Sequence, residues 1–478
     1  MPEETRPETA APEVGSAERP LRVAIVGAGP SGFYTAAALL AAARTDDTGP
    51  TVSIDVFDRL PAPYGLVRYG VAPDHPKIKA VDRVFEKLCL DPRVRFLGNV
   101  ELGRDLSRED LLAHFDQVVY AVGGQSDRRL GIPGEDLAGS HSSTGFVAWY
   151  SGHPDFLDLE VDLSCEAAAV VGIGNVAMDV ARILARSADD LAATDIADHA
   201  LEVLRGSRVR DVYVLARRGP VQAKCSPPEL KELGEIADTG VVVGAGDLAL
   251  DPVSAAECEQ DRQAKKNLEL LAAYANADGA AAGRRIHLRF LAAPVEILGA
   301  EGKVTGLVVE RTRLEDAGGG RLNAVGTGET ETLPVGLVVR AIGYRSLPLS
   351  SLPFDERNGV IPNEKGRILD PATGAPLPRE YVVGWVKRGP TGLIGSNKPD
   401  GVETAAAMLE DLPALTPVPA EAAAPQAVDA LLAARGARPV PFCDWQRLDA
   451  LEVERGRPDG RPRVKFVRVA DMLAALDG

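Results

Sequence analysis

Cysteine patterns that would support metal or disulfide chemistry are missing from this 478-residue sequence. Its five cysteines lie far apart, with no Cys-x-x-Cys or other close pair, which excludes a redox-active disulfide and a set of iron–sulfur ligands. The six histidines show no metal-ligand spacing either, so we expect no bound metal. The cysteines are Cys89, Cys165, Cys225, Cys258 and Cys443.

Long apolar runs are also absent. No stretch of about 18 consecutive apolar residues occurs, so we expect no membrane span. The opening segment MPEETRPETAAPEVGSAERP is rich in proline and acidic residues. It has neither the apolar core of a secretory signal nor the basic amphipathic character of a mitochondrial transit peptide. We therefore expect a disordered tail over residues 1–20 and a cytoplasmic protein.

Positive charge is in deficit, because the formal net charge is -16. A nucleic acid needs a basic surface, so we expect no nucleic-acid partner. The composition, with 45% hydrophobic and 26% charged residues, is ordinary for a soluble globular protein. A chain of this length has room for two or three domains with cores of their own.

A dinucleotide-binding pattern lies near the N-terminus. The apolar run LRVAIV is followed by GAGPSG and an alanine-rich segment, which is the order of a buried strand, a turn and a helix. Gly27 permits the tight turn, Gly29 lets a pyrophosphate approach the backbone, and Gly32 lets the helix pack closely on the strand. The next strand ends at Asp58, about 26 residues after Gly32, where a carboxylate can accept hydrogen bonds from a ribose.

A second unit of the same kind begins at Ala167. The strand AAAVV leads into Gly172-Ile173-Gly174-Asn175-Val176-Ala177, a G-x-G-x-x-A turn, and then into a helix expected over residues 178–188. Two such units in one chain favour two bound dinucleotides over a chance repetition of a turn.

The strand after the second turn ends in Arg217 and Arg218 in place of an acid. A guanidinium matches the 2′-phosphate of NADP, which a carboxylate would repel. The alternative interpretation is that both arginines are solvated residues at a strand end. Their position favours NADP.

Further helices and strands follow from the apolar periodicity. We expect helices over 78–90, 189–204, 251–278, 401–409, 428–434, 445–452 and 469–476, and strands over 94–97, 100–102, 117–122, 286–290, 295–298, 304–311 and 337–342. Ser226-Pro227-Pro228 marks the start of another helix, which carries Glu229 and Glu232. From the residues alone, these acids are best interpreted as an exposed charged face.

A glycine-rich segment near the C-terminus also suggests cofactor binding. The run YVVGWVKRGPTGLIGSNKPD joins a strand to a helix, and backbone N–H groups at such a helix start can stabilise negative charge on a reduced flavin. Trp385 offers a flat apolar surface in the same segment.

Together these motifs resemble the adrenodoxin reductase-like ferredoxin–NADP(+) reductases, bacterial FAD-dependent enzymes, over about residues 21–478. The GLVRYGVAPDHP and GWVKRGPTG strings are highly specific to that family. The matching motifs, in chain order, are GAGPSG, LPAPYGLVRYGVAPDHPKIK, AVGGQSD, IPGED, GIGNVAMDVARIL, RRGPVQA and GWVKRGPTGLIGSNK.

The resemblance implies an α/β fold of the glutathione-reductase-like flavoprotein type, with two Rossmann-like domains. A discontinuous FAD domain (21–127 and 346–478) would receive an inserted NADP domain (128–345). The implied FAD contacts are Gly27, Gly29, Ser31, Gly32, Asp58, Leu66, Leu102, Trp385, Gly392, Leu393 and Ile394. The implied NADP contacts are Arg128, Gly172, Gly174, Asn175, Val176, Ala177, Arg217, Arg218, Glu229 and Gly392.

The same resemblance assigns catalysis near the flavin to His75 and Glu232. Glu232 is then interpreted as a functional residue and not as part of an exposed charged face. A structural loop histidine is the alternative for His75. The implied reaction takes a hydride from NADPH to FAD and passes single electrons to ferredoxin, feeding acceptors such as cytochromes P450.

Three features depart from the family pattern. Asp58 stands where many members have Glu, Lys224-Cys225 stands where a small and an aromatic residue are usual, and the acidic tail has no counterpart. The first change shortens the reach to the ribose by one methylene group and keeps the chemistry.

Three other functions compete with this interpretation. A thiol-disulfide reductase of the same architecture needs a close cysteine pair, which is absent. A flavin monooxygenase lacks the distinctive strings. An electron-input subunit of a larger flavoprotein complex, like the small subunit of glutamate synthase, usually carries cysteine clusters of its own.

The expected partner is a small, acidic iron–sulfur protein such as a ferredoxin, bound by a monomer. A basic face between the domains would bind it, and the candidates are Arg205, Arg208 and Arg210, or Lys265 and Lys266. At a net charge of -16, docking must rely on local charge within a Debye length of about 8 Å.

Overall fold

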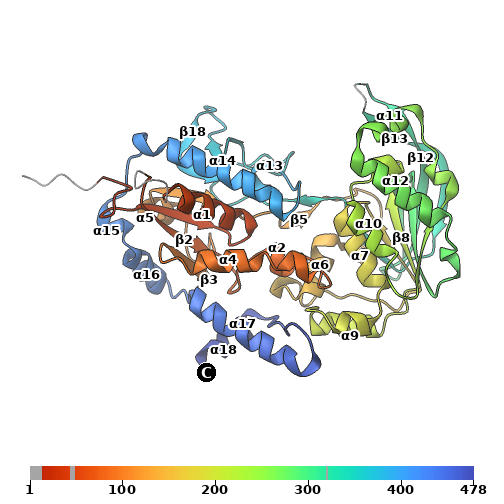
Figure 1. The fold of residues 1–478 in the computed structure, drawn as a ribbon, viewed down its shortest axis with the longest axis horizontal. Helices are drawn as coiled ribbons and strands as arrows, with labels where there is room; N and C mark the ends of the chain where they lie inside the picture. The colour runs from red at the N-terminus through yellow and green to blue at the C-terminus, as the bar shows by residue number, and fades with distance from the viewer. Residues whose placement is uncertain (1–12, 44–48, 319–320) are drawn as a thin grey trace, which may run out of the picture.

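Two α/β units, each with its own sheet, make up the chain (Figure 1). The structure, a computed structural model, describes residues 13–43, 49–318 and 321–478. Two short strands, β5 (Ser126–Asp127) and β15 (Tyr344–Arg345), pair antiparallel where the chain passes between the units. The chain therefore leaves the first unit and returns to it at the same place.

The first unit holds an eight-stranded sheet in the order β16-β17-β18-β4-β1-β2-β3-β19. Its five central strands run parallel, and all six residues of β1 are buried because helices cover both faces. The strands are β1 (Leu21–Val26), β2 (Val52–Phe57), β3 (Val94–Gly98), β4 (Gln117–Tyr120), β16 (Asn363–Glu364), β17 (Arg367–Leu369), β18 (Pro376–Val382) and β19 (Val440–Pro441).

Helices from both ends of the chain pack on this sheet. The closest pair, α1 and α14, comes from segments more than 350 residues apart, which makes the unit discontinuous in sequence. The helices are α1 (Pro30–Ala42), α2 (Leu66–Tyr69), α3 (Pro76–Lys79), α4 (Asp82–Cys89), α5 (Arg108–His114), α13 (Trp385–Arg388), α14 (Asn397–Glu410), α15 (Ala420–Ala423), α16 (Pro425–Ala434), α17 (Phe442–Gly456) and α18 (Val469–Asp477).

The second unit holds a six-stranded parallel sheet in the order β6-β14-β7-β8-β10-β9. Its strands are β6 (Ser140–Ser142), β7 (Ala167–Val171), β8 (Asp211–Ala216), β9 (Thr239–Val243), β10 (Arg284–Phe290) and β14 (Leu337–Arg340). Its helices are α6 (Ser143–Ser151), α7 (Asn175–Ala185), α8 (Ala188–Ala192), α9 (Asp198–Arg205), α10 (Pro227–Leu233), α11 (Pro252–Gln260) and α12 (Arg262–Ala275).

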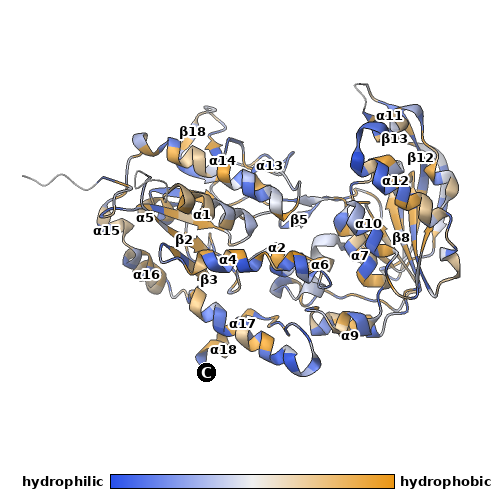
Figure 2. Ribbon diagram, in the orientation of Figure 1, coloured by the Kyte–Doolittle hydropathy of each residue, from blue (hydrophilic) through white to orange (hydrophobic). Residues whose placement is uncertain are grey.

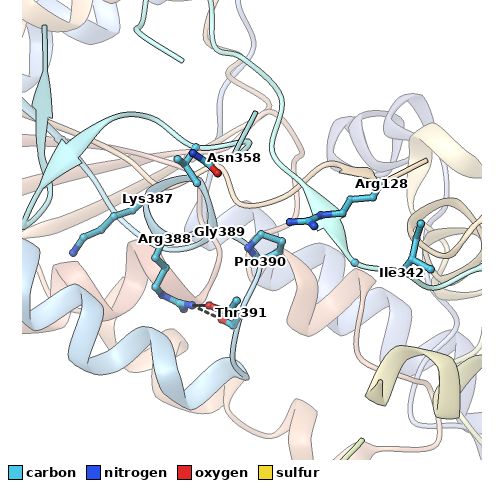
Figure 3. Close-up of a pocket in the computed structure, with 10 residues that line it drawn as sticks. Arg128, Ile342, Asn358, Lys387, Arg388, Gly389, Pro390 and Thr391 are labelled. Carbon is cyan, nitrogen blue, oxygen red and sulfur yellow. Dashed lines mark hydrogen bonds between the residues drawn. The ribbon is translucent and has the colours of Figure 1, made fainter. Parts of the chain in front are cut away.

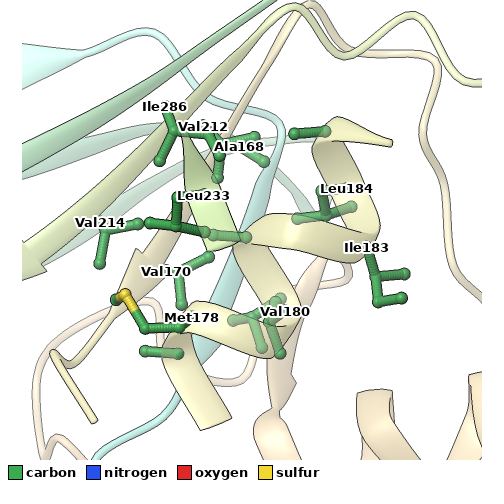
Figure 4. Close-up of a cluster of buried hydrophobic side chains, with 14 of the residues drawn as sticks. Ala168, Val170, Met178, Val180, Ile183, Leu184, Val212, Val214, Leu233 and Ile286 are labelled. Atoms are coloured by element: carbon green, nitrogen blue, oxygen red, sulfur yellow. The ribbon is translucent and has the colours of Figure 1, made fainter. Parts of the chain in front are cut away.

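The core of the second unit lies between its sheet and α7. Val170 and Val214 from the strands meet Met178 and Leu184 from the helix, all fully or almost fully buried (Figure 4). Figure 2 shows that the buried strands are apolar and the helix surfaces polar, with orange along β8 and blue on the outer surfaces of several helices. This packing holds the glycine turn between β7 and α7 at the carboxyl edge of the sheet, where ligands of such folds bind.

A three-stranded antiparallel sheet lies beside the second unit. It consists of β11 (Ala292–Ala300), β12 (Lys303–Asp316) and β13 (Leu322–Leu333). Strand β13 is absent from the sequence-based assignment because most of its residues are polar or glycine and exposed. Exposure on both faces removes the apolar alternation by which a strand is identified.

The C-terminal segment ties the two units together. Lys465 donates a hydrogen bond to the carbonyl of Ser151 at 3.0 Å and lies 3.1 Å from the carboxylate of Asp195, both in the second unit. Lys79 from the first unit lies 2.6 Å from the same Asp195 carboxylate. Burial lowers the pKa of Lys465 to about 7, although Asp195 opposes the shift.

The structure differs from the sequence-based assignment in several places. The helices expected over 78–90, 189–204 and 251–278 are each divided in two, into α3 and α4, α8 and α9, and α11 and α12, and α7 begins at Asn175 rather than at 178. No strand covers 100–102, where Leu102 makes only an isolated bridge with Leu106. Arg19, inside the expected disordered tail, is buried and pairs with Asp116 at 2.9 Å. Residues 1–12 of that tail lie outside the described residues.

The described helices include none that is both long and apolar enough to cross a membrane.

Candidate functional site

The first glycine turn is open where a pyrophosphate would approach. Gly27 has φ +115°, and a Cβ on Gly27 or Gly32 would lie within 2.5 Å of a backbone carbonyl oxygen. A Cβ on Gly29, by contrast, would meet nothing within 4 Å. Gly29 also precedes α1 without any side-chain cap, so the first N–H groups of that helix face the open space. The turn therefore fits a bound dinucleotide phosphate.

Asp58 lies at the end of β2, beside this turn. Its carboxylate accepts hydrogen bonds from the backbone N–H groups of Ala28 at 2.9 Å and Leu60 at 3.0 Å. Burial raises its pKa despite those two bonds. Leu66 opens α2 directly after Gly65, which packs against Gly29, whereas Leu102 lies beyond β3. The side chains predicted to contact FAD thus follow successive strands of the first sheet.

The C-terminal glycine-rich segment closes the other side of the turn. Ser31 donates a hydrogen bond from Oγ to Oδ1 of Asn397 at 3.0 Å, which joins α1 to α14. Trp385 stacks obliquely on Tyr344, with ring centroids 4.9 Å apart. Its indole Nε1 is buried and has no hydrogen-bond partner among the described residues. A buried donor of this kind fits a cofactor acceptor, and Gly392, Leu393 and Ile394 follow it along the same loop.

The second glycine turn repeats the geometry of the first. Gly172 has φ +134°, and a Cβ on Gly174, which precedes α7 without a side-chain cap, would meet nothing within 4 Å. Asn175 accepts a hydrogen bond from the backbone N–H of Ser226 at 2.8 Å, which fixes the start of α10 beside the turn. Val176 and Ala177 continue into α7, and Ala177 is fully buried.

Arg217 and Arg218 follow β8 and are held there by their backbone. The carbonyl of Arg217 accepts a hydrogen bond from Thr312 Oγ1 at 2.7 Å, and that of Arg218 accepts one from Leu291 N–H at 3.1 Å. Within the described parts of the chain, neither guanidinium has a hydrogen bond or an ion pair. Both cations are therefore available to a phosphate.

A cavity of about 530 Å³ lies between the two-stranded connection and the loop after α13 (Figure 3). Arg128 extends into it from the connection, opposite Gly389 and Pro390. Arg388 on the far wall is held by Asn397 at 2.7 Å, and Lys387 by Asp400 at 2.7 Å. Arg128 alone of these cations has no ion pair in the described structure, so it is free to meet an anionic ligand.

His75 and Glu232, far apart in the sequence, meet at the boundary between the units. Nε2 of His75 lies 2.7 Å from Oε2 of Glu232. His75 precedes α3 in the first unit, whereas Glu232 lies on α10 in the second. The contact brings together both residues that were predicted to be catalytic.

Arg182 organises the acids around this pair. It is fully buried on α7 and donates to Asp74 at 2.7 Å and to Asp179 at 2.5 Å. It also lies 3.3 Å from Glu229 and 3.5 Å from Glu232. One guanidinium therefore contacts four carboxylates from both units.

The acids of this cluster differ in how readily they ionise. Burial raises the pKa of Glu229 to about 7, and the neighbouring Asp179 adds to the shift, although His75 and Arg182 oppose it. Burial also raises the pKa of Asp179. At Asp74 burial acts in the same direction, but the hydrogen bond and charge of Arg182, together with the charges of Arg186 and His75, outweigh it and the pKa is lowered. Glu229 therefore changes charge near neutral pH.

His75, Asp179 and Glu229 offer ligand atoms within 4.8 Å of one another, a spacing that could hold a metal ion. The guanidinium of Arg182 lies among the same carboxylates and supplies the positive charge that a metal would bring. This geometry favours the arginine over an ion.

Sequence reasoning missed Asp74, Arg182 and the role of Asp179. The available signals were the Asp-His pair at 74–75 and the i, i+3 spacing of Asp179 and Arg182 on one helix face. Neither signal indicates that the two groups meet, because the contact depends on how the two units pack.

The two alternative groups of cations considered for ferredoxin binding lie apart. Arg205 and Arg208 lie in and after α9, and Lys265 and Lys266 on α12, which Figure 1 shows at opposite sides of the second unit. Arg205 pairs with Glu202, Arg208 with Glu166 and Lys265 with Glu259, at 2.9 to 3.4 Å. Acidic neighbours thus neutralise most of these cations locally.

Replacement of Gly29 by Ala should leave the fold intact and weaken cofactor binding. The added methyl group meets no protein atom, but it occupies the space through which the phosphate approaches the backbone. We expect a lower ratio of flavin absorbance to protein absorbance and an unchanged far-UV circular dichroism spectrum. Gly246→Ala, where the methyl group also meets nothing, is the matched control. Full flavin content in Gly29→Ala would show that the turn does not hold the pyrophosphate.

Glu229→Gln should stabilise the protein at alkaline pH. The folded-state pKa of Glu229 is raised from 4.5 to about 7. Its stabilising contribution is therefore present below pH ~4.5 and is lost as the pH rises through ~7. We expect the variant to gain about 3 kcal/mol over the wild type at pH 8.5 and nothing at pH 4. Denaturant unfolding at both pH values measures the difference, and an equal effect at both would contradict the titration.

No model of a known protein family matches the sequence. Named relatives match over almost its whole length. It is 46% identical over 462 residues to the NADPH-ferredoxin reductase FprA of Mycobacterium tuberculosis, covering 95% of this chain and 99% of that protein. It is 42% identical over 471 residues to the mitochondrial NADPH:adrenodoxin oxidoreductase of Arabidopsis thaliana, covering 96% of each.

The structures agree with these sequence matches. The M. tuberculosis FprA structure in complex with NADPH superimposes with a TM-score of 0.90 at 46% identity, covering 96% of this chain and 100% of that one. The matched length, 96% of this chain, extends over both units. The chain therefore belongs to the family of FprA-type NADPH–ferredoxin reductases, the adrenodoxin reductase-like flavoproteins.

Proposed function

We propose that the protein takes a hydride from NADPH and passes single electrons to a ferredoxin, with FAD as the converter between them. The observation that carries this proposal is the pair of open glycine turns, one in each unit. In each turn the space above the second glycine is open, so a phosphate can approach the backbone there. The two units that carry these turns meet at the contact of His75 with Glu232. Two dinucleotides can then reach one boundary.

The first unit would hold FAD. Its phosphates fit above Gly29 at the start of α1, the ribose fits at Asp58, and the buried Nε1 of Trp385 offers a donor. When bound, FAD accepts electrons in pairs and releases them singly, which an iron–sulfur acceptor requires. The protein positions the cofactor and excludes water around it.

The second unit would hold NADPH. Its phosphates fit above Gly174 at the start of α7, and the unpaired Arg217 and Arg218 fit the 2′-phosphate. Arg128 and Thr391, the residue before Gly392, line the cavity of about 530 Å³. Glu229 lies 3.3 Å from Arg182.

His75 and Glu232 would hold a proton at the boundary. Their 2.7 Å contact lets the proton move between Nε2 and the carboxylate, and Arg182 keeps the surrounding acids from repelling one another. The pair can therefore compensate a change of charge at the neighbouring nicotinamide or flavin.

We further propose that residues 21–127 and 346–478 form the FAD domain and residues 128–345 the NADP domain. The strand membership of the two sheets supports these limits, because β5 and β15 lie at both crossings. We propose a cytoplasmic monomer that binds no nucleic acid. The net charge of -16 supports the last statement.

The rival functions find less support. All five cysteines are free and no two form a disulfide, which disfavours a thiol-disulfide reductase. The near-complete coverage of FprA, a reductase by name, disfavours an electron-input subunit of a larger complex.

Stopped-flow spectroscopy of the purified flavoprotein tests the function. NADPH should bleach the flavin rapidly, and a ferredoxin should restore its colour.

Glu232→Gln should retain the flavin and slow its reduction by NADPH about tenfold, because the variant no longer exchanges a proton with His75. Electron delivery to oxygen or to a disulfide, with none to ferredoxin, would contradict the proposal.

Arg217→Ala combined with Arg218→Ala should reduce the preference for NADPH over NADH. Charged hydrogen bonds to the 2′-phosphate contribute about 1.5 to 3 kcal/mol each, so the ratio of the two kcat/KM values should fall by about 100-fold or more. Lys224→Ala, which removes a nearby exposed cation, is the control and should keep the preference. Unchanged discrimination in the double variant would place the 2′-phosphate elsewhere.

A further inference from the structure

The surface of α3 and α4 has an unusual composition. Every exposed residue from 76 to 90 is either basic or apolar. Three of the six large apolar side chains exposed in the described structure lie here, at 43% for Ile78, 52% for Val84 and 59% for Leu90. We use the name α3–α4 patch for Lys77, Ile78, Arg83, Val84, Lys87 and Leu90.

The cations of the patch are not used by the fold. Lys77, Arg83 and Lys87 make no ion pair and no side-chain hydrogen bond within the described chain. The acids of the same helix, Asp82 and Glu86, are half-buried along the groove between α4 and α17, and Arg83 lines that groove beside them. The exposed surface of α3 and α4 thus carries three cations that form no ion pair among the described residues, in a chain of net charge -16.

The patch begins next to the proposed site. Lys77 and Ile78 are the second and third residues after His75, whose ring contacts Glu232 at 2.7 Å. Figure 1 shows α4 beside α2, on the side of the first unit that leads toward the second. A small protein seated on the patch would thus lie close to the boundary where both cofactors are expected.

We propose that the α3–α4 patch is a docking surface for the acidic ferredoxin that accepts the electrons. This inference rests on the proposed function. Unpaired cations attract an acidic partner at short range, and the exposed apolar side chains supply contact area once water is displaced. The alternative cations on and after α9 and on α12 suit this role less well, because three of the five, Arg205, Arg208 and Lys265, are already paired with acids.

Charge reversal tests the patch. The variant K77E/R83E/K87E should raise the KM for an acidic ferredoxin, measured with cytochrome c as the final acceptor, by about tenfold at low salt. The difference should shrink as salt is added. Reduction of ferricyanide by NADPH should keep its wild-type rate, because that small acceptor needs no docking. The variant K303E/R313E/R321E, on exposed residues of the β11–β13 sheet, changes the net charge equally and should leave the ferredoxin KM unchanged.

Several results would overturn the proposal. One is an unchanged ferredoxin KM in the patch variant, and another is an equal rise in the control, which would assign the effect to net charge. Loss of ferredoxin reduction in K265E/K266E alone would place docking on α12. Patch-dependent sedimentation with vesicles of phosphatidylglycerol and phosphatidylcholine would identify a membrane as the occupant.

A second variant keeps the charge constant. I78S/V84S should also raise the ferredoxin KM and spare ferricyanide reduction, whereas wild-type behaviour in this variant would remove the apolar part of the proposal. If the wild-type protein reduces ferricyanide but no ferredoxin, the proposed function fails, and that failure is distinct from an effect confined to the patch variants.

Discussion

The buried guanidinium of Arg182 is the charge on which the arrangement of the two domains depends. Taking a cation out of water costs several kcal/mol, and here Asp74, Asp179, Glu229 and Glu232 compensate it. Without the cation, these four acids from three segments would repel one another. Because the segments belong to both domains, the cluster holds them together, as do the contacts of Lys79 and Lys465 with Asp195, and the contact of His75 with Glu232 lies within it.

The local parts of this structure could be predicted from the sequence, and the parts that depend on domain packing could not. Both glycine turns were predicted because strand, glycines and helix adjoin in sequence. The meeting of His75 with Glu232 was expected only from family resemblance, and the acids around Arg182 were missed, since no pattern in one segment reports its neighbour in another. Strand β13 was not predicted because its side chains are mostly polar and exposed. The division between α3 and α4 was not predicted because the apolar periodicity continues across it.

When an acidic reductase binds an acidic electron carrier, the distance over which charges act decides whether the two repel each other. At physiological salt, charges farther away than about 8 Å are screened, so the net charge of -16 matters less than the few cations at the contact. The α3–α4 patch meets this condition because none of its three cations forms an ion pair among the described residues, whereas Asp82 and Glu86 are half-buried along the groove beside α17. A few unpaired cations at the contact can then attract an acidic partner, although the net charge of the whole chain repels it.

The insertion of one domain into the other has a consequence for synthesis. The six-stranded sheet is complete once β14 ends at Arg340, whereas the eight-stranded sheet still lacks β16, β17, β18 and β19, the last of which ends at Pro441. A ribosome that releases the chain from its N-terminus therefore completes the inserted domain first. The strands β1 to β4 are synthesised first. About 240 further residues, from Tyr120 to Asn363, must be synthesised before the remaining strands of their sheet begin to appear.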